Sequence, residues 1–265
     1  MADERCVEFL QWAAPRLGLR WAGFRRVRGQ VCKRIARRFR ELGLADFAAY
    51  RDHLERTSDE WPRLDELCHV SISRFFRDRE VFTRLTYLLD ERIGTGQHEL
   101  RLWSAGCASG EEPYTLAIVA AFALAPKHPG LTWHITATDA DPLLLERARR
   151  GCYRPSTLRE IPSEWVPLAF EGQGDERCVR PLLRERVEFL QQDLRREMPA
   201  GPFDAILCRN VAFTYFDEPT QRAVLERLVA RLLPEGLLVI GAHEKLPPTT
   251  ALERAAGAAP IFRRT

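Results

Sequence analysis

The polar residues of this 265-residue chain that could do chemistry follow short apolar runs. The first group is a turn of small residues, Ser-Ala-Gly-Cys-Ala-Ser-Gly-Glu-Glu, over 104–112. A turn of this kind that opens a helix brings backbone N–H groups close to a nucleotide-like ligand. It does not read G-x-G-x-x-G, and no lysine follows its second glycine, so the sequence predicts neither a dinucleotide site nor a P-loop.

The turn ends in two acids, Glu111 and Glu112, which allow two interpretations. In the first, they simply complement the positive end of the helix that follows. Alternatively they receive a ligand that is cationic or neutral and carries no phosphate. S-adenosylmethionine (SAM) fits this second interpretation, because it has an ammonium, a sulfonium and a ribose.

Polar residues also end the later apolar runs. Asp139 follows 135–138, where a carboxylate commonly accepts from both ribose hydroxyls. Asp193 follows 187–191 and either accepts from an adenine amine or caps the next helical turn. Arg209 and Asn210 follow 205–208 and are candidates for a ligand crevice.

The elements that must position these residues alternate between strand and helix. We expect strands at 101–104, 133–138, 187–191, 205–208 and 237–241, and helices at 113–124, 142–150 and 219–232. Such alternation predicts an α/β fold, with a mostly parallel sheet covered by helices on both faces and ligands at the carboxyl ends of the strands. Residues 153–186 break the pattern, and we expect a small inserted antiparallel subdomain there, with 178–181 and 183–189 as possible partners.

Residues 1–70 predict a small helical domain, which leaves 71–265 for the sheet. Apolar residues recur every four positions from Val27 to Phe39, so we expect one helix over 24–42, ended by Gly43. Asp46 is the predicted N-cap of a third helix. A fourth is expected to begin at 59 or 60 and to include Leu64 and Leu67.

The helix expected over 24–42 is densely basic. Four of its charges share one face: Arg26, Lys33, Arg37 and Arg40. The face is either merely solvated or docks an acidic partner, and Glu41 alone offsets eight positive charges. A nucleic acid backbone is a further option.

Composition narrows the class of protein. Apolar content of 45% and charged content of 29% are those of a globular protein, and the net charge of +3 does not by itself indicate nucleic acid. The seven cysteines include no C-x-x-C, so we expect free thiols in a reducing compartment. Six histidines, His98 among them, show no metal-ligand spacing. No signal peptide or membrane-spanning run is present, which predicts a cytoplasmic protein.

Five segments together resemble the CheR chemotaxis methyltransferases: 71–82, 103–116, 137–153, 203–221 and 233–246. The runs Trp-Ser-Ala-Gly-Cys-Ala-Ser-Gly-Glu-Glu-Pro-Tyr and Cys-Arg-Asn-Val carry the resemblance most specifically. It implies a class I SAM methyltransferase fold, SAM as cofactor with S-adenosylhomocysteine as product, and transfer of a methyl group to receptor glutamates. It also implies that the basic helix docks the receptor, with no role for nucleic acid. We expect a monomer.

Carried over by position, the resemblance assigns site residues. The residues matched to cofactor contacts are Ser71, Ser73, Arg77, Glu112, Asp139, Asp193, Leu194, Arg209 and Asn210. Within that set the resemblance places Glu112 on the ammonium, Asp139 on the ribose, and Asp193 with Leu194 at the adenine. Arg77 and Tyr215 are expected near the transferred methyl.

Some positions depart from the family's pattern. The family usually has Asn, Thr and Asn where this chain has Ser71, Ser73 and Asp193, and Ser-Glu where it has His243-Glu244. One extra residue precedes Tyr215, so either Tyr215 or Thr214 is expected to line the acceptor site. These departures leave open another protein or a small carboxylic acid as acceptor, or a SAM-binding regulatory module without turnover. Methylation of nucleic acid is a more distant alternative.

Overall fold

In the computed structural model, residues 2–94, 96 and 99–265 are described, and the chain forms two compact units. The helical unit comprises Met1–Ser71 together with Val211–Gln221. The sheet unit comprises Ile72–Asn210 together with Arg222–Thr265. By its contacts, the segment over 211–221 thus groups with the N-terminal helices and not with its neighbours in the sequence.

The helical unit is built from amphipathic helices around a buried aromatic and aliphatic core. Its elements are α1 (Ala2–Ala13), η1 (Ala14–Leu17), α2 (Trp21–Phe24), α3 (Arg28–Glu41), α4 (Phe47–Arg56), α5 (Glu60–Cys68) and α11 (Ala212–Tyr215). Asp46 accepts from the N–H groups of Ala48 and Ala49, which confirms it as the N-cap of α4. The fourth expected helix is confirmed as α5.

The single helix expected over 24–42 is wrong, because α2 and α3 are separate. Gly23 lies against α11 so closely that a Cβ there would be 2.3 Å from the carbonyl oxygen of Thr214. The ring of Phe24 contacts that of Tyr215, with centroids 5.3 Å apart. This packing fixes α2 against α11, and the periodic stripe that continues in α3 (Val31, Ile35, Phe39) is buried.

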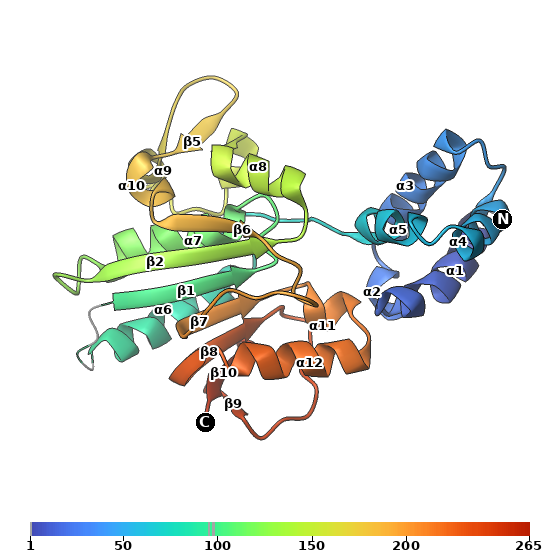
Figure 1. Ribbon diagram of the computed structural model, residues 1–265. Helices are drawn as coiled ribbons and strands as arrows, with labels where there is room; N and C mark the ends of the chain where they lie inside the picture. The colour runs from blue at the N-terminus through green and yellow to red at the C-terminus, as the bar shows by residue number, and fades with distance from the viewer. Residues whose placement is uncertain (1, 95, 97–98) are drawn as a thin grey trace. The chain divides into compact units, whose positions relative to one another are not determined.

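The sheet unit contains a seven-stranded sheet in the order β6-β2-β1-β7-β8-β10-β9, with β6, β2, β1, β7 and β8 parallel (Figure 1). The strands are β1 (Glu99–Ala105), β2 (Thr132–Asp139), β6 (Val187–Gln191), β7 (Phe203–Cys208), β8 (Leu232–Ile240), β9 (Leu252–Arg254) and β10 (Ile261–Arg264). The five expected strands are confirmed. The strands β9 and β10 were not expected, because each is short. Both are antiparallel: β10 pairs with β8, and β9 pairs with β10.

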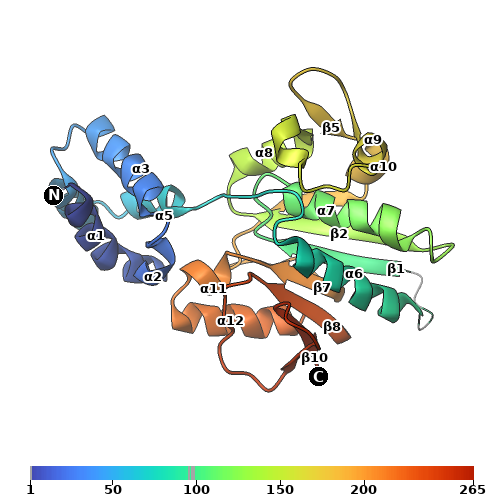
Figure 2. The same ribbon diagram turned by 180° about the vertical axis from the view of Figure 1, so that it is seen from behind.

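Helices cover both faces of this sheet. They are α6 (Arg79–Gly94), α7 (Glu111–Val119) with its continuation η2 (Ala120–Leu124), α8 (Pro142–Arg150) and α12 (Glu218–Val229). In Figure 2, α6 and α7 lie in front of β1 and β2, and Figure 1 shows α12 on the opposite face. Phe75 and Phe76 are buried in the same core, as anchors for the segment that leads into α6.

The insertion forms a second, three-stranded antiparallel sheet in the order β3-β5-β4. Its elements are β3 (Cys152–Tyr153), η3 (Pro155–Leu158), α9 (Val166–Ala169), β4 (Phe170–Glu171), β5 (Arg177–Val179) and α10 (Pro181–Arg184). The expected pairing of 178–181 with 183–189 is wrong, since β5 pairs with β3 and β4 while 187–191 joins the main sheet as β6. The turn of α10 separates the two segments.

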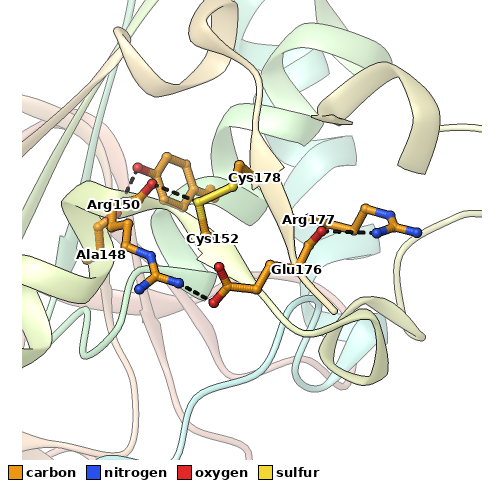
Figure 3. The surroundings of a disulfide bond; sticks show 7 residues. Ala148, Arg150, Cys152, Glu176, Arg177 and Cys178 are labelled. Carbon is orange, nitrogen blue, oxygen red and sulfur yellow. Dashed lines mark hydrogen bonds and ion pairs between the residues drawn. A yellow bond between two sulfur atoms is a disulfide. The ribbon is translucent and has the colours of Figure 1, made fainter. Parts of the chain in front are cut away.

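The expectation of free thiols throughout is also wrong. Disulfides join Cys6 to Cys32 and Cys152 to Cys178. Cys152 and Cys178 face each other across β3 and β5, beside an ion pair between Arg150 and Glu176 (Figure 3). Each pair is 26 residues apart in the sequence, so no local spacing revealed it; tertiary packing brings the sulfur atoms together. The other three cysteines are buried and lie outside these disulfides: Cys68, Cys107 and Cys208.

Candidate functional site

The candidate site of the sheet unit lies where β1, β2 and β7 end. The strands are in register, so that Ser104 of β1 pairs with Ala137 of β2 and Leu207 of β7. The polar residues that follow each strand therefore emerge at one edge of the sheet. This register is the reason why residues far apart in the sequence meet.

The turn after β1 is held open by backbone geometry that favours small residues. Gly106, Ala108 and Gly110 all have positive φ angles, at 83°, 48° and 93°. A Cβ on Gly110 would lie 2.8 Å from the hydroxyl oxygen of Tyr153, which itself donates to the carbonyl of Ser109 at 2.6 Å. The turn is therefore a tight cradle, fixed from one side by the first strand of the insertion.

Asp139 lies beside this cradle at the end of β2. Its Oδ2 accepts from the N–H of Ala108 at 2.8 Å, and its Oδ1 accepts from the N–H of Asp141 at 3.0 Å. The carboxylate thus joins the two loops that follow β1 and β2. Carboxylate oxygens can accept more than one hydrogen bond, so this placement is compatible with the expected ribose contact.

Glu112 and Arg209 form the centre of the site. Arg209 Nη1 donates to Glu112 Oε2 at 3.0 Å, and Ser104 Oγ donates to Oε1 at 2.8 Å. The Glu112 side chain is 14% exposed. Burial raises its pKa above the ordinary value, and the charge and hydrogen bond of Arg209 oppose that rise. A further cation beside Glu112 would favour its ionised form.

Arg209 links Glu112 to the loop that precedes α6. Its Nη2 donates to the carbonyl of Arg77 and to Asp78 Oδ2, both at 2.7 Å. The guanidinium also lies 5.2 Å from the ring centroid of Phe82. Arg209 is 5% exposed, so its hydrogen bonds hold a buried charge in a single geometry.

Arg77 reaches the end of β7 from the same loop. Its Nη2 donates to Asn210 Oδ1 at 3.3 Å, and its Nη1 donates to the carbonyl of Ile72 at 2.7 Å. The loop therefore curls around half-buried Ser73. The structure brings Arg77, Glu112, Arg209 and Asn210, from three segments, into one hydrogen-bonded network. Their contacts with a cofactor stay a prediction.

Asp193 is placed after β6 but is already engaged by a neighbour. Arg195 donates to both of its carboxylate oxygens through Nε and Nη2, with the Nη2 contact at 2.8 Å. The N–H of Arg195 also donates to Oδ1. Leu194 is buried. An adenine amine at Asp193 would share this carboxylate with Arg195, a residue that the sequence reasoning did not include.

The remaining predicted residues lie in the helical unit. Ser71 is exposed and is the last residue of the first segment of that unit. Tyr215 and Thr214 both lie on α11 and both contact the residues around α2. The carbonyl of Tyr215 accepts from the N–H of Arg20, and the carbonyl of Thr214 accepts from Arg20 Nε. Which of the two lines an acceptor site stays a prediction.

The network also contains residues that the sequence reasoning missed. Asp78 binds Arg209, and it has a positive φ of 61°. Glu244 accepts from the N–H groups of Asn210 and Gly241. Asp78 could have been suspected from its place beside Arg77. For Glu244 the signal was its position shortly after a strand end.

The residues present fit SAM as a ligand. Arg209 Nε and Gln192 Oε1 are buried with no hydrogen-bond partner within the described part of the chain, so the site retains unmatched polar atoms. The turn after β1 consists of small residues, and acids end β2 and begin α7. Among residues 2–94, 96 and 99–265, no cluster of side chains could hold a metal ion, and His98 lies outside them.

The basic residues of the helical unit divide into two sets. Arg38 is bound to buried Glu60, and Arg34 donates to the carbonyls of Leu67 and His69. The exposed set consists of Arg25, Arg26, Lys33, Arg37 and Arg40, and we call it the basic face. The residues predicted to share one side of the helix are therefore the ones left to solvent.

No described helix is both long and apolar enough to span a membrane.

Comparison with known proteins identifies similar sequences. Residues 71–260 match the family described as CheR methyltransferase, SAM binding domain. A chemotaxis protein methyltransferase of Salmonella typhimurium is 40% identical over 225 residues, which cover 82% of this chain and 76% of that protein. Chemotaxis protein methyltransferase 2 of Pseudomonas aeruginosa is 38% identical, with 86% and 82% covered.

Proposed function

Because the chain belongs to the CheR methyltransferase family, and is therefore a SAM-dependent methyltransferase, we propose that it methylates glutamate side chains of chemoreceptor cytoplasmic domains. The observation that carries this proposal is the buried network of Glu112, Arg209 and Arg77 at the ends of β1 and β7. In this network Arg209 links Glu112, which can bind a cationic ligand, to Arg77, whose half-buried guanidinium can bind an acidic acceptor.

Each residue has a proposed task in binding. Glu112 holds the ammonium of SAM, and Asp139 accepts from its ribose hydroxyls. Asp193 and Leu194 bind the adenine end, with Ser71, Ser73 and Asn210 completing the contacts. When bound, SAM supplies a methyl group that its sulfonium activates for displacement.

The acceptor requires positioning more than it requires acid–base chemistry. A glutamate side chain is already ionised near neutral pH, so no strong base is needed to activate its oxygen. We assign Arg77 to orient that carboxylate through its guanidinium, with Tyr215 or Thr214 as a second contact. Alignment of reacting groups accounts for a large part of the rate in such transfers.

The basic face is the proposed dock for the receptor. Its five exposed cations lie on or just before α3, and an acidic helical surface would complement them. We further propose that residues 1–70 and 71–265 are the two domains, that the protein acts as a monomer in the cytoplasm, and that it takes no nucleic acid substrate. Disulfides are rare in reducing compartments, so the bonds of Cys6 to Cys32 and of Cys152 to Cys178 count against the cytoplasmic part of this proposal.

The test is ester formation on receptor cytoplasmic domains, measured as base-labile label transferred from methyl-labelled SAM. We expect the wild-type chain to form the ester and Arg77→Ala to lower kcat/KM about 100-fold. Arg79→Ala is the matched control, because Arg79 is an exposed arginine two residues further along. It should remain active.

Other outcomes would contradict the proposal. Normal turnover by Arg77→Ala would remove that residue's role. Esters on small carboxylic acids or on another protein, with none on receptors, would move the activity to a different acceptor. Binding of SAM without turnover on any acceptor would indicate a regulatory module.

A further inference from the structure

Glu244 joins the ends of two neighbouring strands with a single oxygen. Its Oε2 accepts from the N–H of Asn210, just after β7, at 2.8 Å. The same atom accepts from the N–H of Gly241, just after β8, at 2.6 Å. Hydrogen bonds from N–H groups to an ionised carboxylate are stronger than neutral ones, so this contact fixes both strand ends.

The backbone that Glu244 holds is in an uncommon conformation. Asn210 has a φ of 57°, in the left-handed region that residues other than glycine seldom adopt, although asparagine tolerates it better than most. Such a conformation persists where the surrounding structure enforces it. Here the N–H group of that same residue is the one bound by Glu244.

Packing leaves little room for Asn210 to move. A Cβ on Gly241 would lie 2.8 Å from Glu244 Oε2 and 3.0 Å from Asn210 Cγ. The absence of a side chain at Gly241 therefore lets the carboxylate and the amide approach each other. Asn210 Oδ1, which would also lie 3.0 Å from that Cβ, accepts from Arg77 Nη2.

We propose that Glu244 is a positioning residue, which sets the side chain of Asn210 and, through it, the guanidinium of Arg77. The inference rests on the proposed roles of Asn210 and Arg77 in the cofactor site. Glu244 acts through the backbone of Asn210, so its effect depends on a side chain long enough to bring an acceptor oxygen to that N–H group.

The experiment is a double-mutant cycle read by calorimetric binding of S-adenosylhomocysteine, which needs no acceptor. The variants are Glu244→Ala, Asn210→Ala and the two combined. We expect each single change to weaken binding about tenfold, and the double variant to match Asn210→Ala within about twofold, because residues that act through one another are not additive. Glu244→Gln should recover most of the affinity, since its amide oxygen can still accept.

A purely structural role gives a different pattern. In that case the losses multiply in the double variant, and the inference is overturned. If Glu244→Ala does not fold, the cycle is repeated with Glu244→Asp, whose side chain keeps the charge but is one methylene too short to hold both N–H groups. Glu253→Ala, an exposed glutamate on β9, is the matched control and should bind like the wild type. Unchanged binding by Asn210→Ala would overturn its proposed cofactor role and this inference together, while leaving the receptor proposal untouched.

Discussion

Glu112 shows how its surroundings change the chemistry of a single carboxyl. In the sequence it was one of two acids at the start of a helix, and a capping role was as reasonable as a binding role. In the structure Glu111 is bound by Ser109, whereas Glu112 faces Ser104 and Arg209. The two neighbours therefore differ in task, and burial raises the pKa of Glu112.

This environment predicts how SAM affinity depends on pH. The ionised form of Glu112 should bind the ammonium, and its pKa in the free protein lies above the ordinary value of 4.5. We therefore expect affinity to fall as the pH drops through that raised pKa, earlier than for an ordinary carboxyl. Glu112→Gln should bind more weakly, by about tenfold or more, with a flatter profile. Calorimetric titrations between about pH 4.5 and 8 would check this, and an unchanged profile in the variant would contradict it.

At the scale of elements, the helices α3, α4 and α5 are joined by a buried polar network. Glu60, on α5, is 5% exposed and accepts from Arg38 Nε and Nη2 of α3, at 2.9 and 2.8 Å. Tyr50 of α4 donates to the same carboxylate at 2.8 Å. The hydrogen bonds from Arg38 lower the pKa of Glu60. This pair accounts for Arg38, one of the eight positive charges counted in the helix expected over 24–42.

Replacement of this carboxylate should destabilise the helical unit. Glu60→Gln removes the buried carboxylate from Arg38, which then keeps only its longer ion pair with exposed Glu41, at 3.6 Å. We expect a loss of about 3 kcal/mol in the free energy of unfolding. Because the pKa of Glu60 is lowered by folding, its contribution is present above the ordinary value and is lost as the pH falls through the folded value. The difference between wild type and variant should accordingly shrink in acid. Urea unfolding at pH 7 and below pH 4 would measure both effects.

The control for that measurement lies on the same helix. Glu66→Gln removes an exposed ion pair with Arg63, and exposed pairs contribute at most about 1 kcal/mol. An equal loss in both variants would mean that burial of Glu60 adds nothing.

At the scale of the whole molecule, the chain has two compact units with different charge distributions. The net charge of +3 is small, yet five exposed cations gather on the basic face. The 211–221 segment clusters with the helical unit although the sheet unit surrounds it in sequence. The acceptor-side candidates on α11 therefore belong to the unit that carries the basic face.

The basic face gives a prediction about acceptor binding. Lys33→Gln, Arg37→Gln and Arg40→Gln together should raise KM for an acidic receptor domain about tenfold at low salt, with a smaller effect at high salt because screening weakens exposed charges. The affinity for SAM should stay unchanged. The matched control removes three exposed charges from α4 and α5 of the same unit, by Arg51→Gln, Arg56→Gln and Arg63→Gln. Equal effects of both triple variants would show that net charge, not the face, governs docking.

The sequence by itself determined the alternating strands and helices, the cradle over 104–112 and the acids that follow the strands. These features are local, since periodicity, small residues and strand ends are written in neighbouring positions. The parallel part of the main sheet follows from them, whereas β9, β10 and the strand pairing within the insertion do not.

Tertiary structure alone decided which polar residues meet. Three contacts join residues that no sequence spacing connects: the disulfide of Cys152 with Cys178, the hydrogen bond from Asn210 to Glu244, and the ion pair of Arg38 with Glu60. The last of these sets Arg38 apart from the basic face. Each depends on the register of strands or on the packing of helices, which bring distant segments within hydrogen-bonding or bonding distance. Sequence patterns predict the elements; only their packing selects the partner of each side chain.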